Sequence, residues 1–169
     1  MASQSTTDVF LIFTLQVRIT NLIWSHNVIK NCLFVILLWI PSQLLAQDLL
    51  LFGSTSHDEF LGCFNCSEFS SNSICNEFGT YGNEFSGTSI WNQFGRFGNQ
   101  FSSSSPWNQF SSSDDVPVLV DRDGRFYGYF TINYFRSNAV DFASVLQDIY
   151  DRVDGDLEQV RETICSLQL

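Results

Sequence analysis

Basic residues are scarce in this sequence. Its 169 residues include 8 lysines and arginines against 18 aspartates and glutamates, a formal net charge of −10. So acidic a chain repels phosphate backbones, and we expect no nucleic-acid partner. Histidine is scarce too, since only His57 lies outside the first 46 residues. There is no Ser-His-Asp set and no glycine-rich phosphate loop, and we therefore predict no catalytic residue and no cofactor.

The sequence also lacks the run of about 20 apolar residues that a transmembrane helix needs. A shorter run, Leu33 to Ile40, follows Lys30 and is followed by Pro41 and then Ala46. A basic residue, a short apolar core and a small residue at a cleavage position are typical of a signal peptide. We predict a leader over 1–46 that is cleaved near Ala46, and a secreted, periplasmic or cell-envelope protein. If retained, the leader would anchor the protein in a membrane.

This leader is longer than the roughly 15–30 residues of an ordinary signal peptide. Two explanations stay open. Either translation starts near Val28, so that residues 1–29 are not part of the protein, or those residues form an extension whose apolar stretch Val9–Leu15 is a weak membrane segment. N-terminal sequencing separates them, because recovery of residues upstream of Lys30 would contradict the later start.

Residues 47–169 form one predicted domain, which contains a tandem repeat of 16 residues at about 67–111. The copy at 73–88 matches the copy at 89–104 almost position for position, and a third copy begins at 105. Each full copy contains the tetrad Asn-(Glu/Gln)-Phe-(Gly/Ser) twice. Serine is a good helix N-cap, and Gly79 and Gly95 could end a helix in a left-handed conformation. The pattern therefore predicts one helical turn per copy, followed by a chain reversal at Gly82 and Gly98.

Aromatic residues recur throughout the repeat, and two interpretations are open. They could form the core of the repeat, because burial of one phenylalanine or tryptophan is worth roughly 1.5–3 kcal/mol. They could instead stack on a sugar or cell-wall glycan, with Trp91, Trp107, Phe94 and Phe97 as the candidate ligand-binding residues. Buried tryptophans favour the core, and exposed tryptophans favour a ligand. We favour the core.

Strand-like segments flank the repeat. Val116–Val120 and Arg125–Asn133 surround an Asp-Gly turn, which is a strong hairpin signal, and Leu49–Phe52 and Glu59–Asn65 form a similar pair. The two hairpins could join into one small antiparallel sheet of about four strands.

Two amphipathic helices are expected after the sheet. Asn138 begins a capping-box pattern, and an apolar stripe continues to Val153. Gly155 ends this helix, and Asp156 caps a second one. The predicted fold class is therefore α+β, with two hairpins, a loop-rich aromatic turn repeat between them and C-terminal amphipathic helices.

Cysteine offers the best candidate for covalent chemistry. Four cysteines remain after the leader: Cys63, Cys66, Cys75 and Cys165. An even number in an exported chain predicts two disulfides, with three connectivities open. A zinc site with His57 and reduced buried thiols are the alternatives. Asp121-x-Asp123-Gly124 resembles the start of a calcium loop, but an Asp-Gly turn explains it without a metal. We predict no metal site.

The motifs between Phe60 and Asn133 resemble those of a group of bacterial proteins, many of them exported. The shared pattern is S-I-x-N-x-(Y/F)-G-x-Y-G, then S-I-W-N-x-(Y/F)-G and S-P-W-N, and finally P-x-L-V-D-x-D-G-x-F-Y-G-Y-x-T-x-N. It covers about half of the chain, over residues 61–62, 73–89, 91–98, 105–108 and 117–133. The resemblance implies a bacterial origin. It implies no activity, because no function is established for that group.

Three functions follow from these observations. The leading hypothesis is a non-catalytic structural or interaction module of the bacterial envelope or extracellular space, with a protein or envelope glycan as partner. The second is a glycan-binding or cell-wall-binding module that uses the repeat aromatics. The third is a hydrolase that uses two of the many carboxylates.

Overall fold

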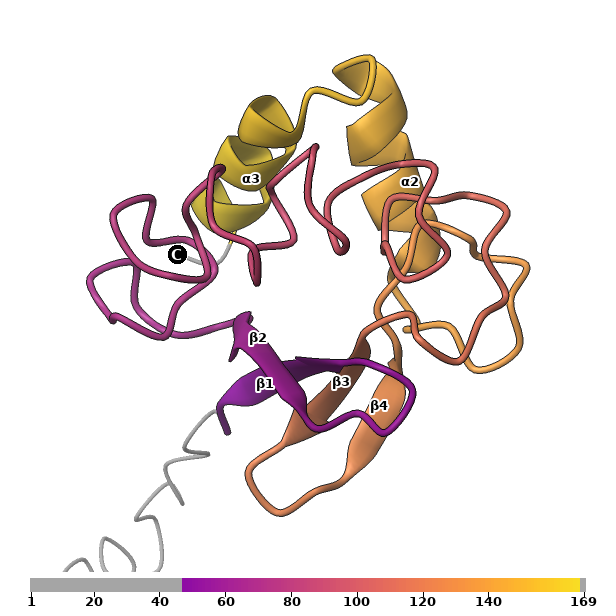
Figure 1. Ribbon diagram of the computed structural model, residues 1–169, viewed down its shortest axis with the longest axis horizontal. Coiled ribbons are helices and arrows are strands. Elements are labelled where there is room, and N and C mark those ends of the chain that lie inside the picture. The colour runs from indigo at the N-terminus through magenta and orange to yellow at the C-terminus, as the bar shows by residue number, and fades with distance from the viewer. Residues whose placement is uncertain (1–46, 168–169) are drawn as a thin grey trace, which may run out of the picture. The chain divides into compact units, whose positions relative to one another are not determined.

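The computed structural model describes residues 47–167, and the predicted leader over 1–46 lies outside them, with its cleavage position and start site. The described elements follow in the order β1 (Leu49–Gly53), β2 (Glu59–Cys63), β3 (Val118–Asp121), β4 (Phe126–Tyr129), α2 (Ala143–Arg152) and α3 (Leu157–Ser166). An antiparallel sheet and two C-terminal helices confirm the predicted α+β fold. In Figure 1 the coil of the repeat lies between the two helices and the sheet.

The four strands form one antiparallel sheet in the order β2-β1-β3-β4. β1 pairs with β2 and β3 pairs with β4, so both predicted hairpins are present. The hairpins join through β1 and β3, where Leu49 lies opposite Asp121 and Phe52 lies opposite Val118. The sheet therefore combines a hairpin that precedes the repeat with a hairpin that follows it.

One buried carboxylate holds the turn between β3 and β4. Asp121 accepts hydrogen bonds from the backbone N–H groups of Arg125 at 2.8 Å and Asp123 at 3.0 Å, and from the Tyr127 hydroxyl at 3.2 Å. These bonds, that of Arg125 above all, hold the pKa of the Asp121 carboxyl below its ordinary value. Gly124 has a φ of 79°. The motif forms a hairpin turn, as predicted, and the Asp121 carboxylate bonds groups of the turn and of β4.

The repeat folds as a chain of consecutive tight turns, with no helix among the described repeat residues. A residue every three or four positions, here called a corner, donates its backbone N–H to the carbonyl oxygen of the corner before it. From the start of the first full copy to the start of the next, the corners are Ser73, Asn76, Gly79, Asn83, Ser86 and Ser89. The predicted helical turn is therefore wrong. The Ser73 hydroxyl accepts from the N–H two residues on, as in a serine turn. Gly79 and Gly95 do not have a positive φ.

Close backbone packing selects the second glycine of each copy. A Cβ on Gly82 would lie 2.1 Å from the carbonyl oxygen of Asn76, and one on Gly98 would lie 2.0 Å from that of Asn92. Neither glycine has a positive φ, so a lack of space and not conformational freedom excludes a side chain here.

The first three residues of each copy form the interior of the coil. The serine that begins each copy and the residue after it are buried, and these residues are Ser73, Ile74, Ser89, Ile90, Ser105 and Pro106. The indole Nε1 of Trp91 donates to the carbonyl oxygen of Ile74 at 2.7 Å, which links one copy to the one before it. A buried indole N–H needs such a partner. The tryptophans of the repeat thus belong to a core, as the favoured interpretation predicts, but that interpretation is wrong for six phenylalanines of the repeat, which are exposed.

A segment that we predicted as strand continues the coil instead. β4 ends at Tyr129, and Ile132 is buried and donates its backbone N–H to the carbonyl oxygen of Pro106 at 2.9 Å. The Asn133 amide donates to the carbonyl oxygen of Ser111 at 3.1 Å. Residues 131–133 therefore cover the last copy of the repeat, which the hairpin signal did not indicate.

Both predicted C-terminal helices are present. α2 begins five residues after its predicted start, because the backbone groups of Asn138 and Val140 hydrogen-bond to Tyr129 and residues 139–142 are not helical. α3 begins as predicted, since the Asp156 carboxylate accepts hydrogen bonds from two backbone N–H groups of the first turn. Val145, which belongs to the predicted apolar stripe of the first helix, is exposed, and so is Leu167 just after the second helix.

Two disulfides confirm the prediction for the four cysteines and select one connectivity. Cys63 is bonded to Cys66 at the end of β2, and Cys75 is bonded to Cys165, which ties α3 to the repeat. The Asp48 carboxylate lies near the sulfurs of the first pair. The bonded sulfurs are not the thiolates that a zinc ion would need, so the zinc alternative is wrong. Such disulfides are typical of proteins that fold in an oxidising compartment.

Candidate functional site

Six phenylalanines of the repeat project into solvent. Their exposed fractions lie between 79% and 90%, and the residues are Phe69, Phe78, Phe85, Phe94, Phe101 and Phe110. Single exposed apolar residues are normal on any protein surface, but six at equivalent positions of a repeat are a patterned feature. We call these six residues the phenylalanine surface.

An asparagine holds the backbone of most of these residues in place. The Oδ1 of Asn92 accepts a hydrogen bond from the backbone N–H of Phe94 at 3.0 Å, and its Nδ2 donates to the carbonyl oxygen of Ser86 at 3.0 Å. Both bonds recur at Asn76 and Asn108. The first bond makes an Asx turn, and the second links neighbouring turns of the coil. The rings that follow an asparagine thus stand on hydrogen-bonded corners of the backbone, so binding through them would cost little backbone entropy.

The phenylalanine surface has a charge gradient along the repeat. Every member follows a glutamate or a glutamine. The first three are preceded by glutamate and the last three by glutamine, and these residues are Glu68, Glu77, Glu84, Gln93, Gln100 and Gln109. The surface therefore pairs each ring with a polar group and is acidic at its N-terminal end.

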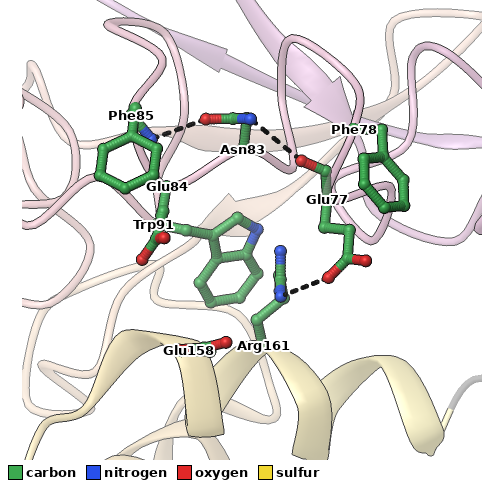
Figure 2. Close-up of a pocket in the computed structure, with 8 residues that line it drawn as sticks. All are labelled: Glu77, Phe78, Asn83, Glu84, Phe85, Trp91, Glu158 and Arg161. Atoms are coloured by element: carbon green, nitrogen blue, oxygen red, sulfur yellow. Dashed lines mark hydrogen bonds and ion pairs between the residues drawn. The ribbon is translucent and has the colours of Figure 1, made fainter.

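Of the four predicted ligand-binding residues, only Phe94 belongs to this surface. Trp91, Trp107 and Phe97 are only 1–2% exposed, which favours the core interpretation, although the Trp91 side chain lines one surface pocket (Figure 2). The two indoles stack on each other with ring centroids 5.3 Å apart, and Phe97 packs beside Gly53 of β1. These three side chains therefore belong to the interior of the coil, and Phe94 belongs to its surface.

A groove runs between the phenylalanine surface and α3. One part of it, about 290 Å³ in volume, is lined by Phe78 and Phe85 of the repeat and by Glu158 and Arg161 of α3 (Figure 2). A neighbouring hollow shares Phe78 and Arg161 and extends to Phe69, and another shares Phe85 and Glu158 and extends into the next copy. The groove therefore consists of three adjacent hollows that follow one another along α3.

Arg161 joins α3 to the repeat in the middle of the groove. Its Nη1 donates to the carbonyl oxygen of Gly82 at 2.9 Å, and its Nη2 lies 3.3 Å from a carboxylate oxygen of Glu77 (Figure 2). A guanidinium as buried as this one needs such partners. Among the described residues, Glu84 and Glu158 form no ion pair, so their carboxylates are available to a ligand.

The titratable groups outside the β3–β4 turn whose pKa values are shifted make contacts that stabilise the fold. The Thr55 hydroxyl lowers the pKa of Asp115, and the Gln159 side chain lowers the pKa of Asp156. Burial raises the pKa of Tyr150, whose ring stacks on Trp107 with the centroids 5.9 Å apart. Each shift follows from a contact that holds a turn or a helix, and none indicates a general acid or base.

Comparison of the chain with models of known protein families finds no match, and neither the curated proteins nor the solved structures include a similar one. Within residues 47–167, no helix is long and apolar enough to cross a membrane.

Proposed function

We propose that the protein is a non-catalytic interaction module of the bacterial envelope or extracellular space, and that it binds its partner through the phenylalanine surface. The exposure of six rings on rigid corners carries this proposal. Each exposed ring forgoes the roughly 1.5–3 kcal/mol that burial would contribute, so its retention needs a reason other than folding. The signal-peptide pattern and the disulfides support the location.

Binding of the purified protein to envelope fractions of its host tests the proposal by co-sedimentation. The test variant replaces Phe78, Phe94 and Phe110 with serine. The matched control replaces three exposed apolar residues outside the surface, which are Phe135, Val145 and Leu167. We expect the test variant to bind at least about tenfold more weakly, because loss of central aromatic anchors costs the most in binding, and the control to bind like the wild type. Equal binding by both variants contradicts the proposal.

Glycan recognition is a second candidate, favoured by the glutamate or glutamine before every exposed ring. Carboxylate and amide groups can bond sugar hydroxyls while a ring packs on the apolar face of the sugar. Pre-treatment of the envelope separates the two classes of partner. Loss of binding after glycan hydrolysis identifies a glycan, and loss after proteolysis identifies a protein.

A further inference from the structure

The groove along α3 is strongly acidic. Glu68, Glu77 and Glu84 line it from the repeat, and Glu158 and Glu162 line it from α3. The cation among its lining residues, Arg161, already bonds Glu77 and the repeat backbone. The whole chain carries a formal charge of −10. Charge complementarity therefore favours a cationic occupant and disfavours an anionic one.

The phenylalanine rings of the groove point to the same occupant. Ammonium and guanidinium groups are attracted to aromatic faces, and a neighbouring carboxylate adds a charge-assisted hydrogen bond. The protein contains such contacts already, since the guanidinium of Arg136 lies 3.6 Å from the ring centroid of Tyr129 and that of Arg96 lies 5.1 Å from that of Phe97. A groove that alternates carboxylates with exposed rings suits a chain that alternates cationic with apolar side chains.

We propose that this groove binds a basic polypeptide segment, whose lysine or arginine side chains bond the glutamates while its apolar side chains pack between the rings. This inference rests on the proposed function, because it names the partner of part of the same surface. The three hollows lie next to one another along α3, from Phe69 past Phe78 and Phe85. Such an elongated shape fits an extended peptide better than a compact small molecule.

Fluorescence anisotropy with a labelled peptide of repeating lysine, leucine and serine tests this inference. The same peptide with glutamate in place of lysine is the control probe. The test variant is E68Q/E84Q/E162Q, which removes three groove carboxylates that form no ion pair among the described residues and keeps the bond between Glu77 and Arg161. The control variant, D58N/D123N/D141N, makes the same change in charge outside the groove.

We expect the wild type to bind the lysine peptide, with an affinity that falls as salt is added. E68Q/E84Q/E162Q should bind at least about tenfold more weakly, whereas D58N/D123N/D141N should stay within about twofold, since screening limits the effect of distant charges. Equal affinity of both variants, or equal binding of the glutamate peptide, overturns the inference.

The two proposals fail in different ways. If the lysine peptide does not bind but envelope binding still depends on Phe78, Phe94 and Phe110, the proposed function stands and the basic partner is wrong. If envelope binding does not depend on these phenylalanines either, both proposals are overturned. If glycan hydrolysis alone abolishes envelope binding, the partner is a glycan and the inference of a basic peptide is again overturned.

Discussion

The indole nitrogen of Trp107 donates a hydrogen bond to the carbonyl oxygen of Ile90, which lies 2.6 Å away and one copy earlier in the repeat. The same bond joins Trp91 to the copy before it. The coil contains no regular ladder of strand hydrogen bonds, so these side-chain bonds connect its successive copies. The stacking of Tyr150 on the Trp107 ring then extends the column of rings to α2.

Replacement of Trp107 with phenylalanine should lower the free energy of unfolding by about 2–4 kcal/mol, because the buried carbonyl of Ile90 loses its donor and the smaller ring leaves a cavity. Urea denaturation of the variant measures this. Phe94→Ser, at an exposed position in the preceding copy, should change stability by no more than about 0.5 kcal/mol. Equal losses in the two variants would contradict the assignment of Trp107 to the core.

The glycines of the repeat provide a matched pair of substitutions. Gly98→Ala should be strongly destabilising, since the new Cβ would lie 2.0 Å from the carbonyl oxygen of Asn92 and the backbone must move. Gly87→Ala should be neutral or stabilise by about 0.4–1 kcal/mol, because a Cβ there meets no atom within 4 Å and alanine restricts the unfolded chain. Thermal unfolding of both variants is the measurement, and a tolerated Gly98→Ala would contradict the tight coil.

The two disulfides should contribute unequally to stability. The bond between Cys75 and Cys165 closes a loop over a separation of 90 residues, whereas that between Cys63 and Cys66 spans 3. Loop entropy alone predicts a loss of about 4–5 kcal/mol for the C75A/C165A variant and about 2 kcal/mol for C63A/C66A. Denaturant unfolding of the two variants tests this order, and a larger loss in C63A/C66A would show that local strain or packing outweighs loop closure.

Acid should weaken the hairpin turn between β3 and β4. The pKa of Asp121 is lower in the folded protein than in the unfolded chain. The carboxylate therefore contributes its full stability at a pH above the pKa of the unfolded chain, and this contribution is lost as the pH falls through the pKa of the folded protein. The Asp121→Asn variant should be less stable near neutral pH and should lose less stability than the wild type between about pH 5 and pH 2. Urea denaturation across this range measures the difference, with Asp141→Asn, an exposed site, as the control.

Local signals predicted much of the fold. The Asp-x-Asp-Gly motif that begins at Asp121 predicted the hairpin of β3 and β4, and Asp156 predicted the start of α3. Both carboxylates accept hydrogen bonds from backbone N–H groups within four residues of themselves. The start of α2 was placed too early. Asn138 has the right residue type for a cap but adopts a left-handed conformation, which its neighbours in the tertiary structure decide.

The repeat shows where sequence reasoning failed. Its period was visible, but an inward tryptophan and an outward phenylalanine are both aromatic, so composition alone could not separate core from surface. One signal could have done so. Phe94, like every member of the phenylalanine surface except Phe69, comes two residues after an asparagine, and an Asx turn puts that residue on an outer corner. Inward positions such as Trp91 instead come two residues after a serine whose hydroxyl is buried.

The phenylalanine surface should be dispensable for folding. Phe78→Ser, Phe94→Ser and Phe110→Ser together should change the free energy of unfolding by less than about 1 kcal/mol, because these exposed rings gain little apolar burial on folding. The matched core variant, Ile90→Ser, removes one fully buried side chain and should cost more than the three exposed changes combined. Urea denaturation of both variants supplies the measurement. A large loss in the triple variant would mean that the rings hold the coil together, so its loss of envelope binding would no longer identify a docking surface.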